Sequence, residues 1–264
     1  MNLTPANDLR RHPAAFSALL ITAVAATDAS LKGGLDLLGV EVPMITFGII
    51  SGAVLTVLGA LLITRLGLWG QLGLLTRPER PRTLLWFLPF AIYGLLPLTA
   101  GPDVATGTAA AAITFGVLIA SWKLIVLALL LHTWLPRGPR TAAALAACLW
   151  GTMHLGGILI GGHPAPTLVL SLSYVFLSFA FVSIRLRTGL IAPLVACYSL
   201  FLTTAALALQ NNGATNLVAT VSDAIPPLAS SVLLAGYGLL AWKRPSQPAA
   251  RHIGLVQRHQ LLGQ

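Results

Sequence analysis

The chain has 264 residues, of which 56% are hydrophobic and 9% are charged, and its mean hydropathy is +0.84. These values lie far outside the range of soluble globular proteins, and no soluble domain fits between the apolar stretches. The sequence therefore predicts an all-α fold, a polytopic bundle of membrane-spanning helices.

Apolar stretches long enough to span a bilayer follow one another along the chain. A spanning helix needs about 20 residues, and we place about eight transmembrane helices at roughly 14–34, 43–64, 83–100, 108–135, 141–162, 168–184, 189–209 and 217–242. The first is the weakest, because Asp28, Lys32 and Asp36 interrupt it. Together the spans form one transmembrane domain over residues 1–242, and the polar, basic residues 243–264 are expected to form a flexible cytoplasmic tail.

The basic residues determine the expected orientation. With eight spans, every Lys and Arg except Lys32 and Lys123 falls at the termini or in the loops on one side of the membrane. The positive-inside rule then places both termini in the cytoplasm and the protein in the inner or plasma membrane. The net charge of +9 is accordingly ascribed to contacts with anionic membrane lipids rather than with nucleic acid.

Three titratable side chains are expected near one depth inside the bilayer. Counted from the cytoplasmic ends at 1.5 Å per residue, Asp28 and His154 lie about 20 Å deep and Lys123 about 18 Å deep. Such groups are costly in lipid and indicate a functional site. Lys123 needs a partner from another helix, a carbonyl, a hydroxyl such as Ser121, or a ligand. Two plainer interpretations stay open: Lys32 neutralises Asp28 one turn away, and His154 is a structural histidine.

The two cysteines do not indicate a metal site. Cys148 and Cys197 both fall within expected spans, at a spacing that fits neither a zinc site nor a structural disulfide. The sequence therefore indicates no metal and no cofactor.

Several segments resemble one known family. RLGLWGQLGLLTRPERPRTLLWFLPF, RGPRTAAALAACLWGTMHLGG and SYVFLSFAFVSIRLRTGLIAPLVACYSL resemble the CAAX-protease and bacteriocin-processing (CPBP) family of intramembrane endopeptidases. The resemblance runs from about residue 65 to 204 and implies a CPBP-like core. In that family a Glu-Glu-x-x-x-Arg, a Phe-x-x-x-His and a His-x-x-x-Asn motif together activate water for peptide hydrolysis.

The motif residues of that family are almost all replaced in this chain. Only the histidine of the second motif is matched, and no acidic residue occurs between Asp103 and Asp223. A protease mechanism of the family type therefore lacks its base. Aligned through RGPR, the first two motifs fall, in order, on Ser121, Trp122, Val126, Trp150 and His154; counted ten residues from Thr188, the third falls on Tyr198 and Leu202.

These replacements predict an altered cavity that suits a hydrophobic small molecule better than a hydrated peptide bond. His154, Lys123 and Tyr198 would supply proton donors or acid/base groups. The expected walls are Ser121, Trp122, Trp150 and Cys197. The protein would then be a non-proteolytic enzyme acting on a lipid-like substrate, or a binding protein, although aromatic side chains that simply fill a dead cavity would give the same pattern.

Other functions stay open at this point. A CPBP-type endopeptidase acting on a membrane peptide would need a non-standard catalytic set, with Asp28 as the missing carboxylate. A non-catalytic pseudoprotease or immunity protein would instead bind a membrane partner on an outer helix face. A transporter would need broken helices or a polar path, and the sequence shows only one dense polar level.

Overall fold

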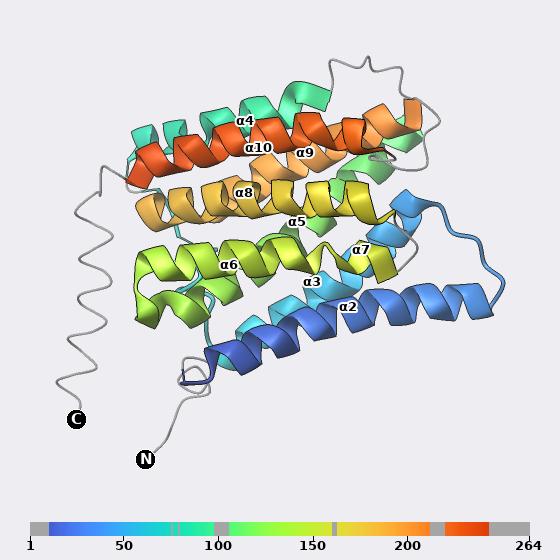
Figure 1. Cartoon of the computed structure of the whole chain (residues 1–264), viewed down its shortest axis with the longest axis horizontal. Coiled ribbons are helices and arrows are strands. Elements are labelled where there is room, and N and C mark those ends of the chain that lie inside the picture. The colour runs from blue at the N-terminus through green and yellow to red at the C-terminus, as the bar shows by residue number, and fades with distance from the viewer. Residues whose placement is uncertain are drawn as a thin grey trace.

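The structure is a computed structural model that describes residues 11–74, 76–78, 80–97, 106–159, 163–211 and 220–242. All regular secondary structure in these ranges is helical (Figure 1), which confirms the predicted all-α class. The expected tail 243–264 lies outside the described residues.

Five helices are long and apolar enough to cross a membrane. They coincide with five of the eight predicted spans, and the chain is a multi-pass membrane protein. A further apolar helix, α9 (Ala192–Asn211), is shorter over its described, apolar part. The five helices are α2 (Pro13–Leu37), α3 (Met44–Leu66), α5 (Thr106–Trp134), α8 (Pro164–Thr188) and α10 (Val221–Trp242).

Two predicted spans are not single helices. The stretch 83–100 forms a 3-10 helix, η1 (Pro81–Phe87), followed by α4 (Leu88–Leu95). Pro89 lacks the N–H that would continue the hydrogen-bond ladder across this junction. The stretch 141–162 forms α6 (Pro139–Met153) and, after a two-residue turn, the four-residue α7 (Gly156–Leu159). The expectation of continuous helices over these two ranges is therefore corrected. The short η3 (Leu135–Arg137) joins α5 to α6.

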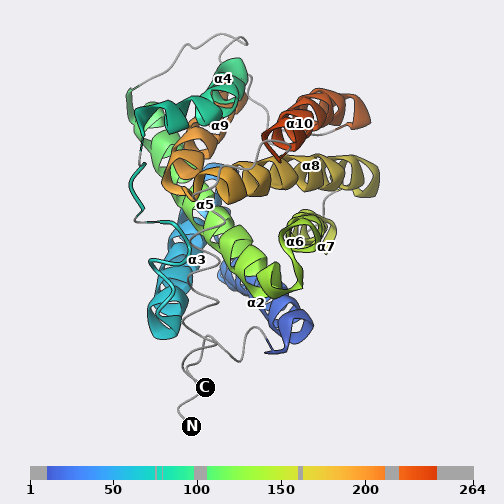
Figure 2. The ribbon, with the colours of Figure 1, turned by 90° about the vertical axis from the view of Figure 1, so that its left-hand side faces the viewer.

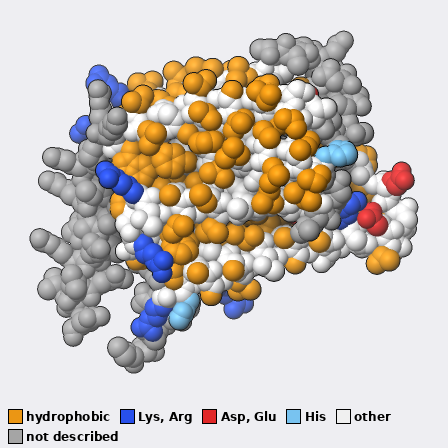
Figure 3. All heavy atoms as spheres, viewed as in Figure 1, with side chains coloured by type: hydrophobic (Ala, Val, Ile, Leu, Met, Phe, Trp, Pro, Cys, Tyr) orange, Lys and Arg blue, Asp and Glu red, His pale blue; other side chains and the backbone are white. Residues whose placement is uncertain are grey.

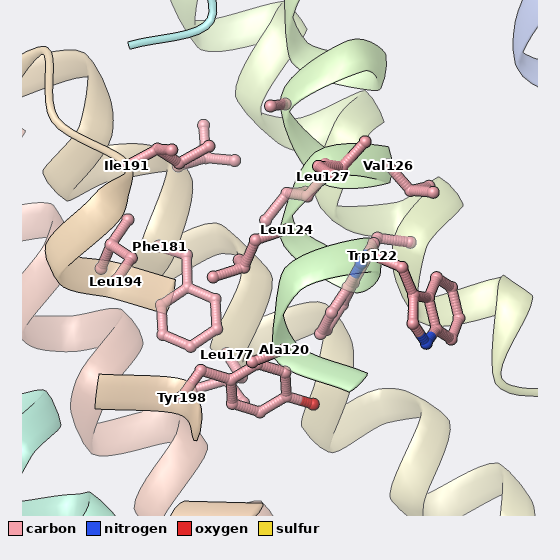
Figure 4. Packing of buried hydrophobic residues seen from close by; sticks show 14 of the residues in the cluster. Ala120, Trp122, Leu124, Val126, Leu127, Leu177, Phe181, Ile191, Leu194 and Tyr198 are labelled. Atoms are coloured by element: carbon pink, nitrogen blue, oxygen red, sulfur yellow. The ribbon is translucent and has the colours of Figure 1, made fainter. Parts of the chain in front are cut away.

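Helix α5 lies at the centre of the bundle. It packs against α3, α6 and α9 and also contacts α2 and α8, while α8 packs against α10 and α6 (Figure 2). The two faces of α5 have different neighbours. Leu124 points toward Phe181 of α8 and Leu194 of α9, whereas Trp122 and Val126 point away from both (Figure 4). A helix that is apolar all round is expected at such a buried position.

Helix α2 lies at the edge of the bundle. Only Pro13, Ser17 and Val24 of its side chains are buried. Trp134 Nε1 at the end of α5 donates a hydrogen bond of 3.0 Å to Ser17 Oγ and fastens the beginning of α2. The remainder of α2 has few packing contacts with α3 and α5, and a helix held at one end separates from its neighbours more easily than one packed along its length.

Charged side chains gather at opposite ends of the bundle. Most Lys and Arg side chains visible in Figure 3 lie at one end, and the acidic side chains lie at the other. Lys32, at the acidic end, forms an ion pair of 3.4 Å with Asp36. This separation along the helix axes is the charge pattern that the positive-inside rule describes.

The loop after α3 is fixed to the turn between α8 and α9. Arg185 Nη2 donates a hydrogen bond of 3.1 Å to Leu72 O, and Ile191 N donates one of 3.2 Å to Gly73 O. Gly73 has φ +73° and lies directly against the backbone of Gly189. These contacts fix residues 71–73 of the loop to the end of α8 and the turn before α9.

Replacing Gly73 by alanine is expected to destabilise this contact by about 3 kcal/mol, through a left-handed backbone and a Cβ that overlaps Gly189 O. Gly67→Ala is the matched control, because Gly67 has φ +64° but nothing within 4 Å of the added Cβ, and should cost about 1 kcal/mol. Unfolding in mixed detergent micelles measures both. Equal losses would contradict the close approach at Gly73.

Candidate functional site

Helix α6 stops at His154 because the histidine side chain competes for a backbone acceptor. His154 Nδ1 lies 3.0 Å from Trp150 O, the carbonyl that would accept the fourth-neighbour backbone N–H in a continuing helix. The His154 N–H instead donates to Gly151 O at 3.0 Å. Gly156, which follows the turn, adds low helix propensity. The interruption has the form of a side chain inserted into the hydrogen-bond ladder.

This arrangement assigns the histidine tautomer. A carbonyl oxygen only accepts, so Nδ1 carries the proton and Nε2 holds a lone pair. Lys123 Nζ of α5 lies 3.0 Å from His154 Nε2 and donates to it. The imidazole lone pair is therefore engaged by Lys123, and His154 becomes available as a base only when the lysine moves away.

Lys123 is held without a carboxylate in direct contact. Its Nζ lies 4.9 Å from the ring centroid of Tyr174, 5.8 Å from Trp122 and 6.0 Å from Trp150, within the range of cation–π attraction. It also approaches the C-terminal end of α6, where backbone carbonyls present partial negative charge. Among the described residues no ion pair to Lys123 is formed. Lys123 therefore finds its partners in the His154 imidazole, the faces of the surrounding aromatic rings and the end of α6.

Aromatic rings pack tightly around the lysine–histidine pair. Tyr174 of α8 stacks on His154, with ring centroids 3.6 Å apart, and Trp150 meets both rings edge-on. Trp150 Nε1 donates a 3.0 Å hydrogen bond to Lys123 O, which ties α6 to α5. Tyr198 of α9 lies 6.2 Å from Trp150 between ring centroids. The space expected between these side chains is therefore filled by rings.

Tyr174 is a member of the site that the sequence analysis missed. It lies 14 residues before the end of α8 at Thr188, or about 21 Å at 1.5 Å per residue. The depth count that singled out Lys123 and His154 would have included it, had aromatic residues been counted with the titratable ones.

Tyr198 brings a second buried polar atom close to the pair. Its side chain is 1% exposed, and the hydroxyl of Tyr174 is the group that its hydroxyl approaches. The phenol of Tyr174 lies near enough to interact with it electrostatically.

Two expected wall residues lie away from the pair. Ser121 Oγ donates to Val117 O of its own helix at 2.7 Å. Cys197 Sγ lies 3.7 Å from Phe87 O, on the side of α9 that faces η1 and α4. The structure does not bring these two side chains to Lys123 and His154.

Asp28 has a partner on another helix. Ser51 Oγ of α3 donates a hydrogen bond to Asp28 Oδ1, and Asp28 lies within electrostatic range of Lys123. Lys32 pairs with Asp36 instead. The interpretation in which Lys32 and Asp28 neutralise each other is therefore wrong, because Lys32 pairs with Asp36, the carboxylate one turn further along α2.

Open space lies on the other side of Trp122, in a groove between α2, α3 and α5. Its volume is about 110 Å³, and apart from Thr27, Gly59 and Trp122 its lining consists of aliphatic side chains. Trp122 is 5% exposed, and its buried Nε1 has no hydrogen-bond partner among the residues described. Asp28, Ser51 and Lys123 are not among the lining residues, and the unpaired polar atom of the groove wall is Trp122 Nε1.

The described ranges hold no group of three His, Cys, Asp or Glu side chains that could bind a metal ion. A comparison of the chain with family models, with curated proteins and with solved structures gives no match in any of the three. The fold and site define a multi-pass helical membrane protein with a half-buried lysine–histidine pair and an apolar groove on the far side of the neighbouring Trp122.

Proposed function

We propose that the protein binds a hydrophobic small molecule inside the membrane, in the groove between α2, α3 and α5, with the polar group of that molecule at the end marked by Lys123. The observation that carries the proposal is the apolar groove beside Trp122, whose buried Nε1 has no hydrogen-bond partner among the residues described, one position before Lys123 and its 3.0 Å contact with His154 Nε2. A binding protein and a non-proteolytic enzyme on a lipid-like substrate share this site.

The cost of placing a lysine within a membrane-spanning helix supports a function for the lysine–histidine pair. The contacts of Lys123 offset only part of the free-energy cost of placing a lysine deep in a membrane protein. An apolar side chain of similar size would avoid that cost. Charged groups in this position are characteristic of ligand sites and proton pathways rather than of structural cores.

Lys123 and His154 can also act as a proton donor and a base. Lys123 can donate to a carbonyl or to a developing negative charge. Once Lys123 turns toward a ligand, the Nε2 lone pair of His154 is free to accept a proton. The stretch between Asp103 and Asp223 contains no carboxylate, which weighs against activation of water for peptide hydrolysis. Acid/base chemistry on a lipid-like molecule is therefore the reaction class that these groups favour.

One observation favours a second candidate, a CPBP-type endopeptidase with a non-standard catalytic set. Helices α5, α6 and α9 carry the residues aligned with the three motifs, and Trp150 of α6 joins them, because its Nε1 donates to Lys123 O and its ring lies 6.2 Å from that of Tyr198; Asp28 lies within electrostatic range of Lys123. This candidate requires that the purified protein cleaves a membrane peptide and that Asp28→Asn abolishes the cleavage. A non-catalytic pseudoprotease would instead tolerate the loss of His154.

The charge distribution supports a location and an orientation. We propose the inner or plasma membrane with both termini in the cytoplasm, because the basic side chains gather at the end of the bundle opposite the acidic ones (Figure 3). Membrane lipids are the partners that this arrangement implies.

Lys123→Met is expected to reduce the amount of hydrophobic ligand that co-purifies with the protein by about tenfold, since a polar contact of about 1.4 kcal/mol corresponds to that factor. Native mass spectrometry of the protein in mild detergent, with lipid analysis of the extract, measures the retained molecule. Lys123→Arg keeps the charge and should retain more ligand than Lys123→Met. Lys32→Met, the matched control at an exposed lysine, should retain the wild-type amount; equal retention by all variants would contradict the proposal.

A further inference from the structure

Lys123 and His154 have the arrangement of a nucleophile beside a base. Lys123 Nζ lies 3.0 Å from His154 Nε2, and His154 Nδ1 donates to Trp150 O, so the imidazole presents its lone pair to the lysine nitrogen. A nucleophile within hydrogen-bond reach of a base that a third group orients is the usual signature of covalent chemistry. We infer that Lys123 forms an imine with the carbonyl group of a long-chain aldehyde.

The lysine nitrogen belongs to a cluster that a reactant can reach. Lys123, His154 and Tyr174 are each only partly buried, whereas the neighbouring Trp150 and Tyr198 are 0% and 1% exposed. Lys123 lies about 18 Å from the cytoplasmic end of its span at 1.5 Å per residue, so its surroundings outside the protein are the hydrocarbon region of the bilayer. A reactant that arrives from there is lipid-soluble, as a long-chain aldehyde is.

The contacts of Lys123 suit imine formation. Among the described residues no carboxylate forms an ion pair with Nζ, so no ion pair has to break before the nitrogen attacks. The ring centroid of Tyr174 lies 4.9 Å from Nζ, and Asp28 lies within electrostatic range. A protonated imine keeps the positive charge of the lysine, and the aromatic face and the carboxylate therefore attract it before and after the reaction.

The reaction balances with the aldehyde as the only added reactant. The Lys123 ammonium group gives a proton to His154 Nε2, and the nitrogen lone pair attacks the carbonyl carbon. The carbonyl oxygen takes the proton back from the imidazolium, which gives a carbinolamine. A second proton passes from nitrogen through His154 to the new hydroxyl group, which leaves as water while the C=N bond forms. Aldehyde and lysine ammonium become protonated imine and water, and His154 ends neutral as it began.

This inference rests on the proposed function, because it takes Lys123 as the group that meets the ligand. It adds the chemical class of that ligand and replaces a hydrogen bond by a covalent bond. Its failure is distinguishable from failure of the proposed function, since non-covalent retention of a ligand through Lys123 needs no imine.

Reductive trapping on the full-length protein tests the inference. The protein is placed in phosphatidylcholine nanodiscs, whose lipid has no primary amine, and hexadecanal is added with sodium cyanoborohydride. The hydride reduces any imine to a stable secondary amine, which peptide mass spectrometry locates. The lysines of the chain are Lys32, Lys123 and Lys243, so the modified site is identified directly. Glyoxylate, a charged aldehyde that stays in water, is the matched reagent.

Hexadecanal is expected to modify Lys123 about tenfold faster than Lys32, whose side chain is 44% exposed. Glyoxylate should show the opposite preference. His154→Gln keeps a hydrogen-bond acceptor near Lys123 but removes the base, and it should slow modification of Lys123 by about 100-fold. Lys32→Arg, the matched control, should leave the rate at Lys123 unchanged.

Modification of Lys32 by hexadecanal without modification of Lys123 would overturn the inference. If native mass spectrometry then still finds a ligand whose retention depends on Lys123, the proposed function stands. Loss of both the imine and the retained ligand would contradict both. Equal rates at Lys123 in His154→Gln and in the wild type would also overturn the inference, because the nucleophile would then act without its base.

Discussion

Replacing His154 by leucine is expected to destabilise the protein by about 3 kcal/mol, because the substitution leaves the Lys123 ammonium group buried without its hydrogen-bond acceptor. The contact at stake is the 3.0 Å hydrogen bond from Lys123 Nζ to His154 Nε2. Trp150 O would lose its partner at the same time, since His154 Nδ1 donates to it. The free energy of unfolding in mixed detergent micelles measures the loss.

The double variant decides whether the pair acts as a unit. Lys123→Met removes the charge itself, so the combination of Lys123→Met and His154→Leu should be more stable than His154→Leu alone. The control is His163→Leu, which replaces an exposed histidine just before α8. It should change the free energy of unfolding by less than about 0.5 kcal/mol. Strictly additive effects of the two site substitutions would contradict a functional lysine–histidine pair.

Replacing Gly116 by alanine is the second substitution with a large expected effect, a loss of about 3 kcal/mol. A Cβ at this position of α5 would overlap Thr203 Oγ1 and lie 2.7 Å from Ser199 O of α9. Backbone atoms account for part of this contact, so a change of rotamer cannot relieve it. The helices would have to separate where α5 and α9 pack most extensively.

Gly34→Ala is the control for Gly116→Ala. Gly34 lies in α2 with nothing within 4 Å of an added Cβ, so alanine should be neutral or stabilise the helix by up to about 1 kcal/mol. Thermal unfolding of the detergent-solubilised proteins distinguishes the two. A similar melting temperature for Gly116→Ala and Gly34→Ala would show that α5 and α9 are further apart than the structure has them.

The hydropathy pattern predicts the long helices well, because a run of apolar residues long enough for the bilayer has few other stable conformations. Hydropathy cannot predict that the span at 141–162 is divided into two helices. Its interruption depends on which atom donates to Trp150 O, the His154 side chain or its backbone. Hydropathy is the same in both cases.

The sequence predicts how deep in the membrane the candidate site lies, but not which way its side chains point. Counting residues places Lys123 and His154 at one level, and the two side chains do meet. Which face of α5 carries Trp122 cannot be read from a helix that is apolar all round. The open space consequently lies beside Trp122 in the groove and not between Lys123 and Tyr198, where the family resemblance suggested it.

Long-range partners also escaped the sequence. Asp28 takes Ser51 of α3 as its donor, although Lys32 stands at helical spacing on its own helix. Local spacing identifies pairs that can form within one helix, whereas the contact with α3 depends on how the helices pack. The interruption of α6 supplies the broken helix that a transporter needs.

An experimental structure of the protein in nanodiscs with its native lipids retained tests the central claim most directly. The account predicts elongated density in the groove between α2, α3 and α5, with its polar end next to Trp122 and Lys123. A groove closed by direct packing of α2 onto α3 and α5, with no density beside Trp122, would contradict it.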